Sequence, residues 1–383
     1  MRRLTLVSFH RWVGLVFGVL LLIQGISGTA MVFRDELQRA LHYDALTVVP
    51  AAKVLPMQSL VDLVRKTHPE SNIVRIDYPK QPSDAAFFRL QAQNGAEQRF
   101  MSVDPYRAVI TRDGSLSAWP VQWMFELHEA LLTGDVGEII VGIVGISLLL
   151  LAATAPFVWW PGRRNLRRSF AVAFNAGSYR LFRDWHRVGG IFVVLILFTI
   201  ALTGITVVWK REAEQLLAHV TPIQTRPAPK VAARSDRVLL PVDRFVNDAQ
   251  SQFGPALVKS VRFPGGSGRV VVVYLRARDT SRPRATDQFW FDGYTGRAIG
   301  AYQAAQLPTA NRALDWMLPI HTGQAFGWIG RTLFFIAALM LSTLAVTGFF
   351  QWTGRRKLLR SKQRGAARNT NDRIRDVANN ATR

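Results

Sequence analysis

The chain has 383 residues, 49% of them hydrophobic, and carries a formal net charge of +22. It contains no cysteine, which excludes structural disulfides, iron–sulfur clusters, thiol catalysis and the covalent attachment of c-type haem. The positive charge suggests nucleic-acid binding, but Lys and Arg are dense in 161–187 and 353–383 and sparser elsewhere. That distribution is typical of a membrane protein, so we expect no nucleic-acid partner.

Four stretches contain no charged residue and no histidine, and each has about the length of a bilayer-spanning helix. They are 12–33, 139–160, 188–209 and 332–352. Backbone groups in lipid must pair with one another, so each stretch is expected to be an α-helix. Aromatic residues stand at most of their ends, as in the aromatic belts of membrane proteins. Four such stretches make buried helices of a soluble core the weaker interpretation.

The basic segments predict the orientation, because dense Lys and Arg mark the cytoplasmic side. We place both termini and the 161–187 loop inside and the two long segments outside. For a bacterium this means a multi-pass protein of the inner (cytoplasmic) membrane with periplasmic segments. A signal peptide is the alternative for the N-terminus, but the first apolar stretch is long and lacks a convincing cleavage site. Residues after Arg360 are expected to be disordered.

The two halves of the chain repeat the same order of motifs, which indicates an internal tandem duplication. The first and third spans follow a His-Arg pair, whereas the second and fourth follow a histidine and close on Trp-x-Gly-Arg-Arg. The matched segments are 10–14 with 186–190, 27–34 with 202–210, His128 with His321, and 159–164 with 352–356.

The two outside segments also share one pattern, in which a Leu-Pro step leads into a helical stretch and then into strand-like runs. The runs are 72–78, 86–91 and 99–103, and then 258–263, 269–275 and 288–291. Each segment is expected to form a small α+β module with one helix and a short antiparallel sheet. The predicted fold is a membrane all-α four-helix bundle with two external α+β modules.

The spans and the repeat together predict the order of segments along the chain. This order is transmembrane helix 1 (1–34), external module 1 (35–120), an outer histidine helix with transmembrane helix 2 (121–161), a cytoplasmic loop (162–185), transmembrane helix 3 (186–210), external module 2 (211–310), an outer histidine segment with transmembrane helix 4 (311–354) and a basic cytoplasmic tail (355–383).

Four of the seven histidines stand at matched positions beside the spans. His10 and His186 lie at the cytoplasmic ends of spans one and three, and His128 and His321 lie at the outer ends of spans two and four. A duplicated unit that folds as a twofold bundle brings equivalent residues face to face, which gives two imidazole pairs. Haem iron takes two opposed axial ligands of this kind. We therefore predict two bis-histidine haems of the b type, with these four histidines as ligands of the iron.

Other sites for the histidines are less well supported. Zinc or copper needs clustered ligands, and no His-x-x-x-His or His-Glu-x-x-His spacing occurs. His42, His68 and His219 have no partners in the repeat and are expected on a solvated surface.

Glycines and arginines beside the histidines fit the same prediction. On an ideal helix the glycines at 14, 18, 25 and 28 lie within about 80° of His10, and those at 190 and 204 lie within about 40° of His186. A stripe without side chains admits a flat ring. Tight packing of a neighbouring helix is an equally good explanation. The arginines can pair with a propionate, although contact with lipid headgroups is the alternative. The residues are Gly14, Gly28, Gly190, Gly204, Arg11, Arg187 and Arg331.

In combination, the 10–12 opening, the 27–29 span end, the 292–296 turn, the histidine entries and the Trp-x-Gly-Arg-Arg exits resemble the PepSY-associated transmembrane family. This family includes PiuB-like iron-regulated proteins and FoxB-type siderophore reductases. The resemblance covers about 4–360, although the turn at 104–108 lacks the Thr-Gly pair.

The resemblance implies PepSY-like external modules and an inner-membrane haem b oxidoreductase of iron acquisition. By implication it passes electrons outward and reduces a ferric siderophore in the periplasm. Fe(II) binds hard oxygen donors less tightly than Fe(III), so one electron releases the metal.

Two alternatives remain open at this point. One is a haem-free membrane-anchored regulator or binding protein of the PepSY type, and the other is a haem protein with a different periplasmic acceptor. No triad or carboxylate pair is arranged for acid–base chemistry, so we predict no catalytic side chain. No Gly-x-Gly-x-x-Gly unit occurs, so the electron donor is expected to be a quinol or a separate cytoplasmic reductase.

Overall fold

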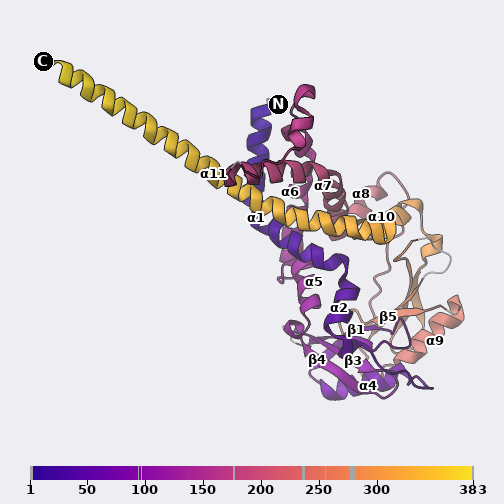
Figure 1. Ribbon diagram of the computed structural model, residues 1–383. Coiled ribbons are helices and arrows are strands. Elements are labelled where there is room, and N and C mark those ends of the chain that lie inside the picture. The colour runs from indigo at the N-terminus through magenta and orange to yellow at the C-terminus, as the bar shows by residue number, and fades with distance from the viewer. Residues whose placement is uncertain are drawn as a thin grey trace. The chain divides into compact units, whose positions relative to one another are not determined.

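The computed structural model describes residues 3–381 apart from 94, 96, 176, 235–237, 255 and 277–281. The chain forms two compact units, and each contains segments from both halves of the sequence. The helical unit comprises 1–29, 140–202 and 332–383, and the sheet unit comprises 30–139 and 203–331. Figure 1 shows the elements from which they are built.

Four long helices build the helical unit. They are α1 (Arg3–Val32), α6 (Asp135–Trp159), α7 (Ser178–Val208) and α11 (Gly327–Ala381). Each is long and apolar enough to cross a membrane, as the four uncharged stretches predicted. Side chains from all four pack into one apolar cluster. Its buried members include Leu21, Val144, Leu197 and Ala337.

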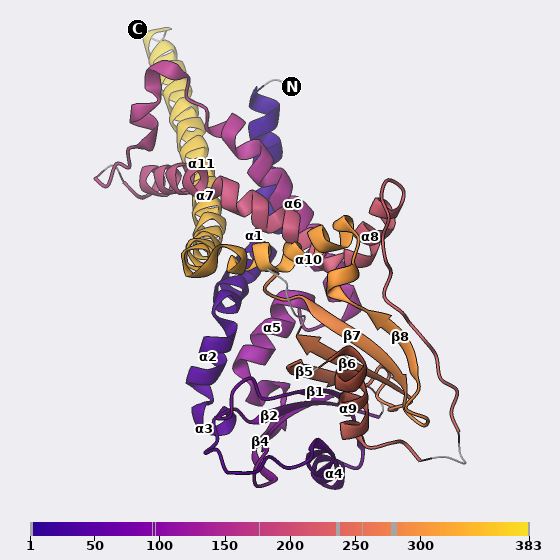
Figure 2. The ribbon, with the colours of Figure 1, turned by 90° about the vertical axis from the view of Figure 1, so that its right-hand side faces the viewer.

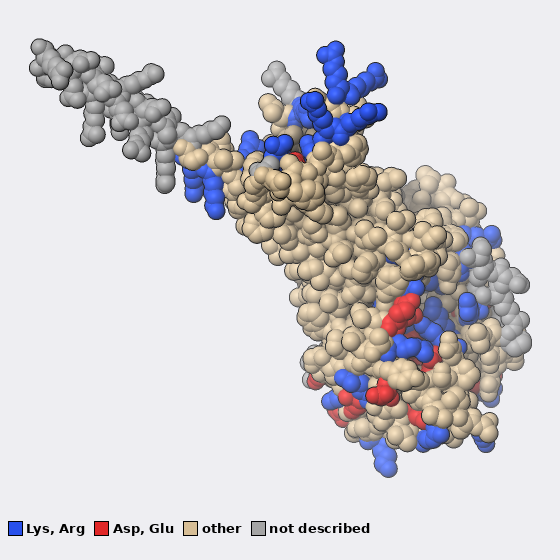
Figure 3. All heavy atoms as spheres, viewed as in Figure 1, with Lys and Arg blue, Asp and Glu red and all other residues tan. Residues whose placement is uncertain are grey.

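The outer faces of these helices are also apolar. Val19 and Leu195 are 71% and 74% exposed. In Figure 3 the helical unit presents an almost unbroken uncharged surface, with Lys and Arg gathered at the end that carries the N-terminus. Apolar surface of this extent is stable in lipid and not in water, and we conclude that the chain is a membrane protein.

Helical structure extends beyond the apolar stretches in three of the long helices. Since α1 begins at Arg3 and α7 at Ser178, His10 and His186 lie about two turns inside their helices and not at the helix ends. α11 continues to Ala381, so the prediction of disorder after Arg360 is wrong. This segment contains no proline and is rich in Arg, Ala and other strong helix formers.

The sheet unit is built on one antiparallel sheet of eight strands in the order β4-β3-β2-β1-β5-β6-β7-β8. The strands are β1 (Ser71–Asp77), β2 (Ala86–Ala92), β3 (Gln98–Asp104), β4 (Val109–Ser115), β5 (Val258–Arg262), β6 (Val270–Arg276), β7 (Thr286–Asp292) and β8 (Ala298–Tyr302). All six predicted runs are strands. The outermost strands β4 and β8 were not predicted, because their residues are mostly half-exposed and show no clear apolar alternation.

The two predicted sheets are in fact joined into one. β1 and β5 pair antiparallel, with Arg75 opposite Arg262 and Ile76 opposite Val261. Pairing of these strands satisfies backbone groups that two separate sheets would leave open at their edges.

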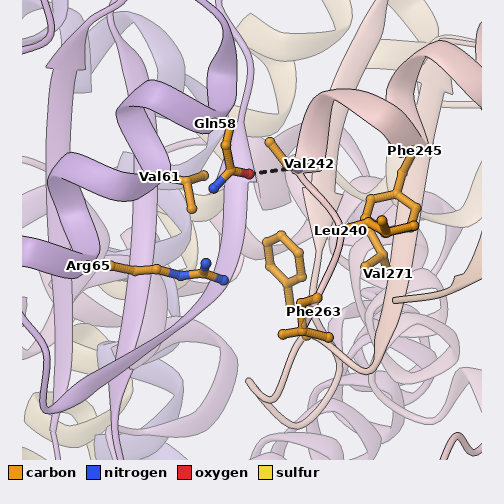
Figure 4. A pocket seen from close by; sticks show the side chains of 10 residues that line it. Gln58, Val61, Arg65, Leu240, Val242, Phe245, Phe263 and Val271 are labelled. Carbon is orange, nitrogen blue, oxygen red and sulfur yellow. Dashed lines mark hydrogen bonds between the residues drawn. The ribbon is translucent and has the colours of Figure 1, made fainter. Parts of the chain in front are cut away.

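Two helices cover one face of the sheet, as Figure 2 shows. α4 (Met57–Thr67) and α9 (Val242–Phe253) pack with the inward side chains of the strands into the main apolar core. Each helix caps the other. The Asp243 carboxylate accepts from the backbone N–H groups of Met57 and Gln58 at 2.9 and 2.8 Å, and the Gln58 side chain accepts from the N–H of Val242 at 2.8 Å. The gap between the two helices in Figure 4 is about 10 Å³, room for no more than one water.

The remaining helices of the sheet unit are short. They are α2 (Arg34–Leu41), α3 (Tyr43–Leu46), α5 (Pro120–Ala130), α8 (Lys210–Ala218) and α10 (Thr309–His321). α5 ends where Leu131 and Leu132 adopt positive φ values of 47° and 62°, and α10 ends before Gly323 at φ 73°. These left-handed residues break the chain between each outer histidine helix and the long helix that follows.

Candidate functional site

The outer histidines lie in the two short helices that precede α6 and α11. His128 is near the C-terminal end of α5, and His321 is the last residue of α10. Their ring centroids are 6.4 Å apart, with 41° between the ring planes. An imidazole nitrogen bonds a first-row metal ion at about 2 Å, so two imidazoles on opposite sides of one ion have centroids roughly 6 Å apart. The observed separation therefore fits two axial ligands of one ion.

His321 is held against the C-terminal part of α7. Its Nδ1 lies 3.3 Å from Thr203 Oγ1. A Cβ added to Gly204 would be only 2.8 Å from Cε1 of the same ring. The missing side chain at Gly204 is thus what lets the imidazole lie directly on the helix backbone. Sequence reasoning placed Gly204 beside a cofactor ring, and the ring that it contacts here is the imidazole of His321.

The inner histidines are held through Nδ1 by neighbouring helices of the helical unit. His10 Nδ1 lies 2.9 Å from Thr154 Oγ1 on α6. His186 Nδ1 lies 3.0 Å from the carbonyl oxygen of Leu344 and 3.2 Å from Thr347 Oγ1, both on α11. Both residues that were predicted as the inner pair therefore lie in the helical unit, each anchored by a different helix.

These contacts fix the tautomer of His186 and are compatible with the same tautomer for His10. A carbonyl oxygen only accepts hydrogen bonds, so His186 donates its Nδ1 proton to Leu344. The Thr154 hydroxyl also lies 2.8 Å from the carbonyl of Leu150, and when it donates its proton there it accepts from His10 Nδ1. With the proton on Nδ1, the lone pair that can bind a metal lies on Nε2. Metal-binding histidines commonly have their other nitrogen anchored in this way.

The anchoring threonines were not recognised in the sequence. Thr154, Thr347 and Thr203 are ordinary residues in apolar helices, where a hydroxyl often bonds only to the preceding turn. A signal was present, since Thr154 and Thr347 lie at nearly the same distance before the closing Trp160 and Trp352. Sequence spacing does not show that these hydroxyl groups face a histidine on another helix.

Three buried N–H groups in the described part of the helical unit lack a hydrogen-bond partner. They are Arg11 Nε, Trp159 Nε1 and Arg187 Nε. Arg11 and Arg187 directly follow the inner histidines, and Trp159 ends α6, the helix that anchors His10. All three groups are donors, so an anionic oxygen ligand would satisfy them. Arg11 and Arg187 were predicted as propionate partners, whereas Trp159 was predicted only as part of the aromatic belt.

Arg331 is used differently from the prediction. Its guanidinium bonds both carboxylate oxygens of Glu36 at 2.6 and 2.7 Å and the carbonyl oxygen of Val32 at 2.9 Å. It also lies over the Phe33 ring, 4.4 Å from the centroid. These contacts use the guanidinium to link α2 to the start of α11, and we leave Arg331 out of the candidate site.

The predicted glycine stripe serves more than one purpose. Added Cβ atoms at Gly14 and Gly190 would meet only leucine side chains, at 3.9 and 3.6 Å. At Gly25 a Cβ would clash with Ser342 Oγ, so this glycine allows α1 to pack closely on α11. Gly28 lies in α1 at the position that matches Gly204 in the repeat. Helix packing, the alternative explanation, therefore accounts for part of the stripe.

The other histidines differ from one another. His42 is buried edge-on against Trp119, with centroids 4.9 Å apart, and burial together with the positive charge of Arg112 lowers the pKa of His42. The expectation of a surface position is wrong for His42, because the apolar ring of Trp119 covers it. His68 bridges Glu70 and Asp113 at 3.1 and 2.8 Å.

His219 is exposed, as predicted. Within the described residues no three His, Cys, Asp or Glu side chains are grouped closely enough to bind a metal ion.

A family model described as the PepSY-associated TM region matches residues 7–355. The match includes all four paired histidines and both series of strands. No curated protein matches the chain.

Proposed function

Since the chain belongs to the PepSY-associated transmembrane family, we propose that it is a di-haem b oxidoreductase of the bacterial inner membrane. Both termini lie in the cytoplasm. The protein moves electrons across the bilayer and reduces the iron of a ferric siderophore in the periplasm, which releases the metal. The observation that carries the proposal is the 6.4 Å separation of the imidazoles of His128 and His321.

The residues of both pairs are chemically suited to haem b. The imidazoles of His10, His186 and His321 have Nδ1 contacts that leave Nε2 for the iron, and no cysteine is present for covalent attachment. Bound haem would supply a one-electron couple at each site. In this proposal His10 and His186 bind the inner haem, and His128 and His321 bind the outer one. The unpartnered donors of Arg11, Trp159 and Arg187 would hold propionate groups.

The substrate part of the proposal rests on family resemblance and on coordination chemistry. Siderophores bind Fe(III) through hard oxygen donors, and these bind Fe(II) less tightly. The reaction consumes one electron per iron and needs no proton transfer from a side chain. The electron comes from a quinol or from a separate cytoplasmic reductase.

Full-length protein purified in detergent from haem-replete cells should be red, with a b-type spectrum and two haems per chain. After reduction with dithionite, it should be reoxidised by ferric siderophores, with formation of Fe(II) that a ferrous chelator traps. A colourless preparation contradicts the haem assignment. A red protein that ferric siderophores do not reoxidise contradicts the assignment of the acceptor.

Thr154→Val should weaken the inner haem site, because it removes the acceptor that anchors His10 Nδ1. Loss of such a support typically costs about 10–100-fold in metal affinity. A less basic imidazole also favours Fe(II), so the midpoint potential of the remaining inner haem should rise. Thr347→Val should have a smaller effect, since His186 retains the carbonyl of Leu344.

Thr343→Val is the matched control, because the Thr343 hydroxyl is exposed and bonds only to the carbonyl of Leu339 in its own helix. Haem content by pyridine haemochrome and a redox titration measure both quantities. Equal effects of Thr154→Val and Thr343→Val would argue against an anchoring role for Thr154.

A further inference from the structure

The sheet unit contains a cavity of about 280 Å³ on the face of the sheet that α4 and α9 leave uncovered. Residues from β5, β7, β8, α8 and α10 line it. Its polar and charged lining residues are Thr206, Lys210, Arg226, Arg262, Arg284, Thr286, Gln288, Tyr302 and Asp315. Four of these are cationic and only Asp315 is anionic, so the cavity is positively charged.

The acidic groups near this cavity neutralise only part of its positive charge. Asp315 lies 3.4 Å from Lys210 and 2.9 Å from Arg282, and Glu214 lies 3.1 Å from Arg226. Arg262 and Arg284 have no ion pair with any described residue, and burial lowers the pKa of both guanidinium groups. Arg262 Nε is buried without a hydrogen-bond partner among the described residues.

Positive charge continues along the sheet from the cavity. Arg89, Arg75 and Arg262 are direct neighbours on three adjacent strands, β2, β1 and β5. Directly opposed like charges destabilise a sheet. Asp77 pairs with Arg75, and Glu126 lies 3.9 Å from Arg89, but Arg262 has no such partner among the described residues. Desolvation together with the positive charges of Arg284, Arg75 and Arg262 lowers the pKa of Lys259 to about 8.

An independent observation points to a ligand with a hydroxyl group. Gln288 lines the cavity and is only 6% exposed, yet its Oε1 has no hydrogen-bond partner in the part of the chain that the structure describes. A buried acceptor of this kind requires a donor. Tyr302 is the direct partner of Gln288 on the neighbouring strand β8. Its hydroxyl accepts from Asn311 at 3.2 Å, so its own proton can be donated to an acceptor.

We propose that this cavity binds a small hydroxypolycarboxylate. Carboxylates would pair with Arg262 and Arg284, and the hydroxyl would donate to Gln288 Oε1. The volume suits a compact tricarboxylate and lies just below the range of about 300–1,000 Å³ usual for larger ligands. Binding of the free polycarboxylate does not depend on the proposed function. A further step does rest on it: if the protein reduces ferric iron, an anionic ferric polycarboxylate would be a substrate bound in this cavity.

Calorimetric titration of the full-length protein in detergent tests the site, with citrate and with tricarballylate, which is citrate without its hydroxyl. Citrate should bind more tightly than tricarballylate. Arg262→Gln should weaken citrate binding by about tenfold or more, as expected for loss of a charged hydrogen bond. Gln288→Leu should abolish the preference for citrate.

Arg244→Gln is the control, because Arg244 lies on α9 and pairs with Asp248. Without ligand, Arg262→Gln should raise the melting temperature, since it removes a charge opposed by Arg75. A lower melting temperature would mean that Arg262 is structural and would contradict the proposal.

Two further arms identify the source of the anion. Inorganic phosphate and anionic-lipid nanodiscs are titrated against the citrate-loaded protein. If phosphate or the anionic lipid displaces citrate at a concentration below that of citrate, the site prefers phosphate or a lipid headgroup. That result would overturn the proposal. If a colourless protein binds citrate, the haem proposal is contradicted and the anion site is supported. If a red protein binds no citrate, the haem proposal is supported and the anion site is contradicted.

Discussion

His321→Ala should remove one of two haems, and His128→Ala should remove the same one. The two ring centroids lie 6.4 Å apart, a separation that fits a single metal ion between them. Without either histidine only one side chain of the pair remains to hold the iron, so the outer haem should be lost. Haem content should fall from two to about one per chain, and the low-spin signal of one centre should disappear from the electron paramagnetic resonance spectrum.

His10→Ala and His186→Ala should each remove the other haem, the inner one. Each should leave the signal of the outer haem unchanged, because these two histidines are anchored within the helical unit. His219→Ala is the control, since His219 is exposed at the end of α8. If His10→Ala and His128→Ala removed one common haem, the assignment of pairs would be wrong.

Gly204→Ala should impair the outer site, although it adds only a methyl group. The new Cβ would be 2.8 Å from Cε1 of His321, and an ordinary contact begins at about 3.4 Å. The ring must therefore move by several tenths of an ångström, close to the tolerance of about 0.5 Å for a functional site. Affinity for the outer haem should fall by about tenfold or more.

Gly190→Ala provides a matched comparison on the same helix. Its Cβ would meet only a leucine methyl at 3.6 Å, an ordinary contact. Both substitutions replace a helical glycine with alanine, so both gain the same helix propensity. Haem content and the spectrum of the outer haem should change only for Gly204→Ala. Equal haem content in the two variants would show that the contact with His321 is unimportant.

Local patterns predicted the elements of this fold well. The four runs without charged residues predicted the four long helices, because a bilayer-spanning helix needs about 20 apolar residues. Six of the eight strands were predicted, since β-branched and aromatic residues gather in them. β4 (Val109–Ser115) was not predicted because it is an edge strand with few buried side chains. Its sequence therefore shows no clear apolar alternation.

Contacts between distant segments were much harder to predict. The repeat predicts which histidines correspond, but it does not predict that Thr203 and Gly204 lie against His321. Likewise, arginine is the residue type expected to pair with a propionate, so the sequence suggested this role for Arg331. Only the fold shows that Glu36 lies beside Arg331 and pairs with it. The opposition of Arg75 and Arg262 depends on strand register, which no local signal reveals.

The pairing of β1 with β5 has a consequence for how such a chain could arise. Both strands hold the same place in their four-strand series, and they run antiparallel. An antiparallel contact between equivalent strands is self-complementary, so a twofold axis would map each strand onto the other. A polypeptide with a single copy of the unit could therefore form this contact as a homodimer. Fusion of two copies would make that association permanent and leave each half free to diverge, so that a cationic cavity need be kept on only one side.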